Sequence, residues 1–357
     1  MHGFGLRPGE DGTQFYAKYA ENSFLDTVIS RGHGEDAESV ARLAVYGGAA
    51  EVALAASSVT SDAIASRMGM GNPNGNLVMA DNEKGAGLWL APVYKNHESD
   101  DFDAEGVNYG VDLDLTGVAL GADYTFGSNV RGGAMFAVGS GDADGQGAGS
   151  AVSNDFDFWS VGVYGGYAYE AFSLTADLSW TQVDNDIDAN TAAAGKVSAS
   201  MDADVLSAGL TAKYDFDLDT VKVAPHLGMR YTSIDIDDYT VSDIASSDVD
   251  SISVFSIPAG VTFSTEIASA SGWNVKPALD LTVTLNTGDD EVDSDVRFNG
   301  VDMTTDLTSE FIDDVTYGAT VGVQVQKDAF QFGLGVNYTG SDNTDEFGVG
   351  ANARFTF

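Results

Sequence analysis

The sequence predicts an all-β protein, a transmembrane antiparallel β-barrel of about twelve strands with an N-terminal α-helix inside the pore. Three observations predict this fold class. Apolar and polar side chains alternate with a period of two residues from near Gly85 to the C-terminus, which indicates strands with one apolar face. The links between the alternating runs are short and long in turn. Residues 1–84 lack the alternation and contain a run of small, helix-forming residues.

The predicted helix covers residues 35–68. The segment begins with acidic residues, which suit a helix N-terminus, and continues mainly with Ala, Ser, Gly and Val. A continuous helix of this length would extend about 50 Å, longer than the roughly 30 Å hydrocarbon core of a bilayer. Because its side chains are small, it fits a narrow pore, with Arg42, Glu51, Asp62 and Arg67 offered to a polar wall. The alternative is a surface helix of a soluble domain, which would normally carry larger apolar residues on its buried face.

The alternating runs are the predicted strands. In one of them Phe330, Phe332 and Leu334 alternate with Gln331 and Gly333. The predicted strands are residues 85–95, 107–126, 129–140, 155–169, 172–186, 199–216, 220–236, 252–267, 272–287, 314–326, 329–339 and 345–357. Each can cross a bilayer, which takes roughly 9 to 11 residues of a tilted strand. A soluble β-sandwich or a β-solenoid is the alternative, but aromatic residues at many strand ends favour a membrane barrel with interfacial girdles.

The link lengths predict how the barrel is oriented. Short links fall at residues 127–128, 170–171, 217–219, 268–271 and 327–328, and most of the others are long and acidic. Outer-membrane barrels have short periplasmic turns and longer external loops. The first strand then rises from the periplasmic side, the helix runs downward through the pore, and residues 1–34 lie outside the cell.

One strand breaks the alternation. Leu113 and Leu115 are at odd positions, whereas Val118 and Leu120 are at even positions. A β-bulge near Thr116 and Gly117 would bring all four apolar side chains to the same face.

Composition excludes several functions. The 55 acidic residues against 16 basic ones give a formal net charge of -39, which opposes nucleic-acid binding. The absence of cysteine excludes disulfides, thiolate metal sites and cysteine nucleophiles. The segment Asp142 to Gly147 is similar to part of a calcium loop, but it lacks the third early acid and the distant Glu, so a solvated loop is expected. No cofactor or metal is expected.

Catalysis is not indicated either. The histidines are His2, His33, His97 and His226, and no Gly-x-Ser-x-Gly nucleophile motif stands in a convincing setting. His226 has the polar parity of its strand and is expected to line the lumen. The other residues predicted to face the lumen are Lys213, Arg230, Lys276 and Asp280.

Four segments resemble the translocator domain of autotransporters, the self-associated exporters of Gram-negative bacteria. They are ARLAVYGGAAEVALAASSVTSDAIASRMG before the barrel, GLWLAPVY in the first strand, GVALGADYTFGSNVRGGAMFAVGSGDADG in the next two, and FGVGANARFTF at the end. The resemblance covers about residues 38–357. It implies that the barrel lies in outer-membrane lipid and carries its own upstream passenger polypeptide to the cell surface. It also implies help from the barrel-assembly machinery and periplasmic chaperones.

The resemblance divides the chain into three parts. Residues 1–34 are the end of the passenger or a linker, 35–84 the pore helix and its connection, and 85–357 the twelve-stranded barrel. The start MHGFGLRPGEDGTQF lacks a signal peptide, so a precursor is expected to carry the signal upstream. Phe355 and Phe357 are the predicted assembly signal, because a terminal aromatic is common to many outer-membrane barrels. Some family members cut their own pore helix beside an Asn-Asn pair, but this sequence has no adjacent Asn pair, which argues against that self-cleavage.

Two functions from other classes are the alternatives. A passive porin would have an open lumen and would conduct ions freely, whereas a plugged translocator should conduct poorly until residues 35–68 are deleted. An outer-membrane barrel hydrolase would need a catalytic dyad at the external rim and would act on lipid or peptide substrates.

Overall fold

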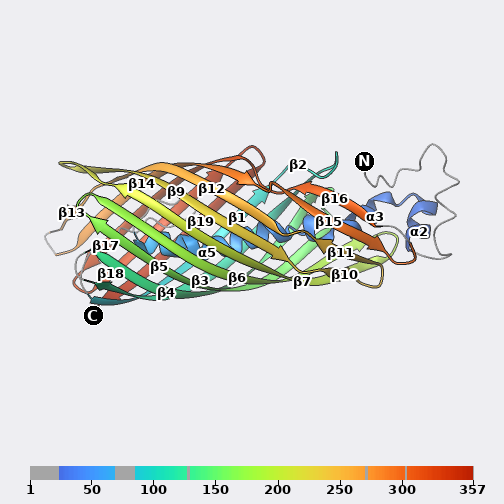
Figure 1. Cartoon of the computed structure of the whole chain (residues 1–357), viewed down its shortest axis with the longest axis horizontal. Coiled ribbons are helices and arrows are strands. Elements are labelled where there is room, and N and C mark those ends of the chain that lie inside the picture. Colours follow the sequence, from blue (N-terminus) through green and yellow to red (C-terminus); the bar gives the residue numbers. More distant parts are fainter. Residues whose placement is uncertain (1–23, 69–84, 127–128, 270–271, 302–303, 357) are drawn as a thin grey trace.

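The structure is a computed structural model that describes residues 24–68, 85–126, 129–269, 272–301 and 304–356. Twelve long antiparallel strands form a closed barrel around a helix (Figure 1). The barrel closes where the first strand, β1 (Gly85–Ser99), pairs with the last, β19 (Thr344–Thr356). The fold class predicted from the sequence is therefore confirmed.

The other barrel strands follow one another around the sheet. They are β3 (Asn108–Phe126), β4 (Val130–Gly147), β5 (Val152–Tyr169), β6 (Phe172–Thr191), β7 (Gly195–Tyr214), β9 (Val221–Ile236), β12 (Ile252–Ser264), β14 (Asn274–Gly288), β17 (Val315–Lys327) and β18 (Phe330–Gly340). Short strands β2 (Phe102–Asp103), β8 (Phe216–Leu218) and β13 (Ile267–Ala268) extend the edges. Each predicted strand coincides with one of the twelve, and several extend farther than predicted at the long-loop end.

A second sheet covers the long-loop end of the barrel (Figure 1). Its strands are β10 (Tyr239–Val241), β11 (Ala245–Val249), β15 (Glu291–Phe298) and β16 (Thr305–Glu310), paired in that order. These stretches belong to the connections predicted to be long loops. We name this sheet the cap sheet. Phe298 and Val249 are buried on its inner face, and Phe298 stacks on Phe24 with ring centroids 6.3 Å apart.

The outer face of the barrel has an apolar band. Leu120, Val163 and Leu334 are each about half exposed, as side chains facing lipid should be. Rows of outward aromatic residues border the band. Tyr124, Tyr167, Tyr214 and Phe330 lie toward the short turns, and Tyr94, Trp159, Trp180, Tyr231 and Tyr338 toward the long loops. Such girdles mark the two membrane interfaces.

An acidic belt follows the second aromatic row on the outer face. We give this name to Asp112, Asp114, Asp142, Asp144, Asp155, Asp157, Asp184, Asp186, Asp202, Asp204 and Asp235. Many of these residues face one another on adjacent strands, as Asp184 does Asp202 and Asp204 does Asp235. Asp142 and Asp144 lie in strand β4, so the expectation of a loop at Asp142 to Gly147 is wrong.

No bulge interrupts β3, contrary to the sequence-based prediction. Its pairing with β4 continues residue by residue from Tyr109 to Phe126, and Leu113 and Leu115 point inward and are fully buried. The two faces exchange polarity instead. Within the apolar band the outer face is apolar and the lumen polar, whereas beyond it the outer face is wet and acidic and the lumen is dry.

The N-terminal elements lead into this dry part of the lumen. They are α2 (Phe24–Arg31), α3 (Gly34–Ala41), α4 (Leu43–Tyr46) and α5 (Ala49–Met68). The predicted single helix is therefore interrupted. Gly48 has φ of +65°, a left-handed conformation that favours glycine, and it ends the α4 turn before α5 begins.

Helix α5 runs along the barrel lumen (Figure 1). Met68 at its end lines the same cavity as Glu170 and Ala171, in the short turn between β5 and β6. None of the described helices is both long and apolar enough to cross a lipid bilayer. The predictions for residues 1–23 and 69–84 lie outside the described residues.

Candidate functional site: the helix inside the barrel

Helix α5 fits the lumen because its side chains are small. Seventeen of its 20 residues are buried, and Ala53, Ala56 and Val59 are almost completely so. The helix packs on the wall formed by β3 to β9. On its other side a cavity of about 250 Å³ remains, lined by Leu54 and Ser58 of the helix among others.

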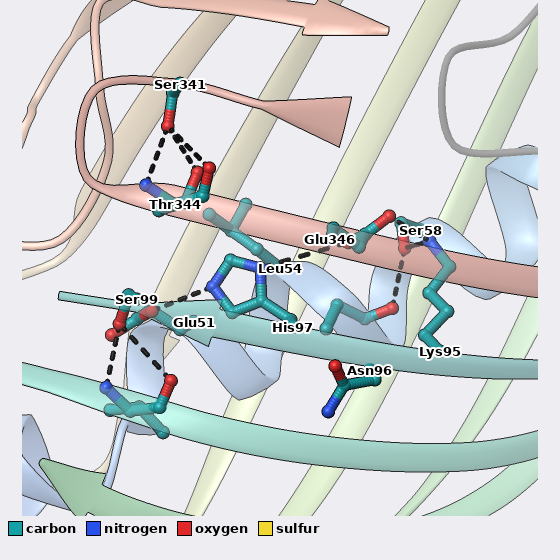
Figure 2. A network of polar contacts seen from close by, with 12 residues as sticks. Glu51, Leu54, Ser58, Lys95, Asn96, His97, Ser99, Ser341, Thr344 and Glu346 are labelled. Carbon is teal, nitrogen blue, oxygen red and sulfur yellow. Dashed lines mark hydrogen bonds and ion pairs between the residues drawn. The ribbon is translucent and has the colours of Figure 1, made fainter. Parts of the chain in front are cut away.

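A first ionic network joins the middle of α5 to the wall. Lys95 of β1 is completely buried, with its Nζ 2.7 Å from Asp62 Oδ2 and 3.7 Å from Glu346 Oε1 of β19. The ring of His97, two residues along β1, lies 2.9 Å from Glu51 and 4.0 Å from Glu346. Figure 2 shows Lys95 and His97 between the helix and the strand of Glu346. Two helix carboxylates thus meet Lys95 and His97 of one strand.

A second network holds the end of α5. Arg67 donates two hydrogen bonds to Asp123 of β3, one of them from Nη2 to Oδ1 at 2.8 Å. Arg131 and Arg354 also lie within 3.9 Å and 3.8 Å of this fully buried carboxylate. The Tyr164 hydroxyl donates to Asp123 at 3.0 Å. Three guanidinium groups therefore surround one carboxylate.

Aromatic side chains support the second network. The Trp89 indole donates to the Tyr164 hydroxyl at 2.7 Å. Trp89 lies directly against Gly121, where an added Cβ would come within 2.2 Å of the indole. Glycine at this position lets a large ring lie flat on the wall, which leaves space for the helix.

The long-loop end is held mainly by apolar packing. Arg42 donates to Ser309 and, at 3.0 Å, to the carbonyl of Thr308, both in the cap sheet, and lies 3.2 Å from Glu105. The rings of Tyr46 and Tyr109 lie 5.5 Å apart. The surrounding buried residues include Leu43, Val111, Leu113, Ile187, Ile236 and Phe311. The structure thus places Arg42 above the pore, at the cap sheet, and not along the membrane-level wall.

The structure places the other predicted lumen residues on the inner wall. His226 lies 2.9 Å from Asp280, and Thr262 and Thr282 donate to the same carboxylate at 2.6 and 2.7 Å. These hydroxyls are therefore bonded to Asp280, not to the imidazole as a nucleophile would be. His226 therefore pairs with a carboxylate of the barrel wall.

The remaining three have other surroundings. Arg230 forms a two-point ion pair with Asp177, with both distances 3.0 Å, and donates to Ser207 at 2.7 Å. Lys213 and Lys276 line a cavity of about 490 Å³ at the short-turn end.

The wall partners of the helix were not predicted from the sequence. These are Lys95, His97, Glu346, Asp123, Arg131 and Arg354. All have the inward parity of their strands, and that signal was available in the sequence. The pairing itself was not, because it depends on the depth and rotation of the helix in the pore.

The predicted assembly signal is described in part. Phe355 points outward, is 41% exposed, and its ring lies 5.0 Å from that of Phe330 on the neighbouring strand. Phe357 lies outside the described residues.

A family model and two solved structures are similar to this chain. The model of the autotransporter β-domain family matches residues 88–352. The translocator domain of the autotransporter NalP from Neisseria meningitidis is similar to this chain with a TM-score of 0.63 and 12% identity, covering 88% of this chain and 99% of that domain. The β-domain of the Bordetella autotransporter BrkA gives a TM-score of 0.59 and 17% identity, covering 76% and 100%. At these identities the structural likeness shows the fold alone. A search of curated proteins gave no match.

Proposed function

This chain belongs to the autotransporter β-domain family, and on that premise we propose that it carries a passenger polypeptide, joined to its own N-terminus, to the cell surface and anchors it there. Membership of this family makes the barrel an outer-membrane translocator. The passenger and its display are the proposed part.

The direction of the helix carries the proposal. Met68 lies at the short-turn end of the barrel, and α2, whose Phe24 stacks on Phe298 of the cap sheet, lies at the opposite end. Because short turns are periplasmic in such barrels, the chain before α2 leaves the barrel on the external side. A passenger fused to this end would therefore be outside the cell.

The filled lumen argues against a passive porin. Helix α5 and its two ionic networks occupy the space through which solutes would diffuse. Cysteines at Ala55 and Ser207, which line one cavity, are expected to crosslink and to keep ion conductance low. Deletion of residues 49–68 should raise the conductance. Equal, high conductance of the crosslinked and the deleted barrels would favour the porin.

We also propose that the barrel catalyses no reaction. Replacing His97 and His226 should leave display intact apart from stability effects, and a lipase or peptidase activity lost in either variant would contradict this. The proposed partners are the passenger, the barrel-assembly machinery, periplasmic chaperones and outer-membrane lipid. The exposed Phe355 at the lipid face supports the last of these.

An epitope placed at two sites tests the direction of the chain. Fused upstream of residue 1, it should bind antibody on intact cells. The same epitope inserted between Glu170 and Ala171 is the control, because that turn is expected in the periplasm and should become accessible only after permeabilisation. If the N-terminal epitope also needs permeabilisation while the barrel is folded and heat-modifiable, the proposal is wrong.

A further inference from the structure

We infer that α5 clamps the seam between β1 and β19, so that closure of the barrel depends on the helix being in the lumen. The seam is the junction of the first and last barrel strands. This inference concerns the closed barrel itself, and it stands whether or not the chain exports a passenger.

The seam lacks one support that the other junctions of barrel strands have, a direct chain connection. Neighbouring barrel strands are consecutive along the chain, whereas β1 and β19 are its two ends and no turn joins them. Their pairing runs from Gly87 to Ser99 on β1 but skips Ala91 and Pro92. Proline has no N–H to donate to the ladder. The closure therefore relies more on side chains than a hairpin does.

In the half of the seam nearer the long loops, those side chains act through the helix. Lys95 is on β1 and Glu346 is on β19, yet their charged atoms are 3.7 Å apart, while Lys95 Nζ is 2.7 Å from Asp62 of α5. His97 is likewise 4.0 Å from Glu346 and 2.9 Å from Glu51 of α5. The shorter contact in each pair belongs to the helix. Figure 2 shows how the two β1 side chains bridge the helix and β19.

The half of the seam nearer the short turns is bridged as well. Arg67 of α5 and Arg354 of β19 share the carboxylate of Asp123 on β3, the neighbour of β1 on its other side. Asn352 of β19 donates to Ser66 of α5 at 3.5 Å. Between the two bridges the inward positions of β19 are Gly348 and Gly350, which have no side chain. Both ends of the seam thus contact α5.

Removal of the helix charges should loosen the seam in particular. Lys95 is fully buried, so loss of its nearest anion leaves a desolvated ammonium group with one carboxylate, Glu346, and the Ser58 hydroxyl. The structural change that should cost the least free energy is a separation of β1 from β19, which lets water reach Lys95.

The test is amide hydrogen exchange of the full chain in detergent micelles, compared strand by strand. Asp62→Asn and Glu51→Gln change only the helix and preserve shape, and they leave the direct Lys95 and Glu346 pair intact. We expect exchange in β1 and β19 to become about tenfold faster in each, the effect of losing one charged hydrogen bond. Exchange in β6 and β7 should be unchanged.

Arg230→Met is the matched control. It breaks the ion pair with Asp177 and the hydrogen bond to Ser207, and both partners lie on β6 and β7, outside α5 and the seam. It should loosen the β6, β7 and β9 region and leave β1 and β19 as they were. Equal loosening of the seam by the control, or no change at the seam in both helix variants, would overturn the inference.

A covalent lock supplies the second measurement. Tyr94 and Val349 are directly opposite each other across the seam, and the chain has no other cysteine to compete. A disulfide between Tyr94→Cys and Val349→Cys should return the exchange of the Asp62→Asn barrel to that of the parent chain. If Asp62→Asn alone does not assemble, the locked variant should, and its failure to assemble would count against the clamp.

Discussion

Asp123→Asn should be among the most destabilising single substitutions in the barrel. The carboxylate is fully buried and is surrounded by Arg67, Arg131 and Arg354. Asparagine has nearly the same shape but no charge, so three guanidinium groups would stay buried without their anion. Removing one partner of a buried ion pair costs about 3–5 kcal/mol. With three cations around one anion, we expect about 4–5 kcal/mol.

A double-mutant cycle sharpens this prediction, because the structure fixes its sign. Arg67→Met leaves Asp123 with two cations at 3.8 and 3.9 Å and should cost less, about 1.5–3 kcal/mol. In the Asp123→Asn background, by contrast, Arg67 is an unpaired cation, so its removal should restore part of the lost stability. The double variant should therefore be more stable than Asp123→Asn alone.

The assay is urea unfolding of the barrel in lipid vesicles, followed by the gel mobility of folded and unfolded protein. Arg230→Met serves as the comparison, because it breaks a lumen ion pair outside this network. Additive effects of Asp123→Asn and Arg67→Met would show that the two side chains do not share a network, and the reasoning would fail.

Four further predictions concern the surfaces of the barrel and its N-terminal helices. Partial burial and neighbouring carboxylates raise the pKa of Asp142, Asp184 and Asp204 in the acidic belt. A raised pKa in the folded state means that ionisation of these carboxyl groups disfavours folding, so their contribution to stability should fall as the pH rises above 3.8. The unfolding temperature of Asp184→Asn should therefore vary less with pH than that of the parent chain. One molar salt should raise the unfolding temperature by screening the same repulsion, and a decrease would contradict it. Trypsin should cut after the exposed Arg31 and spare the buried Arg42; the reverse order of cleavage would disprove the packing of α3. Replacing Phe355 and Phe357 by Ser should remove about 1.5–3 kcal/mol of apolar stabilisation per ring and leave protease-sensitive protein in the periplasm, and normal amounts of folded barrel would refute their role.

The barrel strands could be predicted because their signal is local. Alternation and link length are written in consecutive residues, so the twelve strands and their order follow directly from the sequence. The prediction failed where the environment of a face changes along one strand. Leu113 looked displaced in register, but it continues the inward face into a region where the lumen is dry.

For the contacts between the helix and the barrel wall, the sequence indicated the helix residues but not their partners. Small residues in α5 and charged ones at Glu51, Asp62 and Arg67 indicated a helix facing a polar wall. Their partners Lys95 and Asp123 lie far away in sequence, and the match depends on how deep the helix sits. The cap sheet was missed because its strands are short and follow acidic turns, so they resemble loops in composition.

The charged contacts of α5 are spread along its length, at Glu51, Asp62 and Arg67, and this spacing has a mechanical consequence. A pull from outside the cell acts along the helix axis and therefore loads each charged contact with the wall in shear. In that shear geometry the three contacts bear the load together and do not break one after another. The interruption at Gly48 lies between the pull and these contacts, so stretching begins there, outside the clamped segment. The segment around Gly48 should therefore extend under load before the charged contacts of α5 with the barrel wall break.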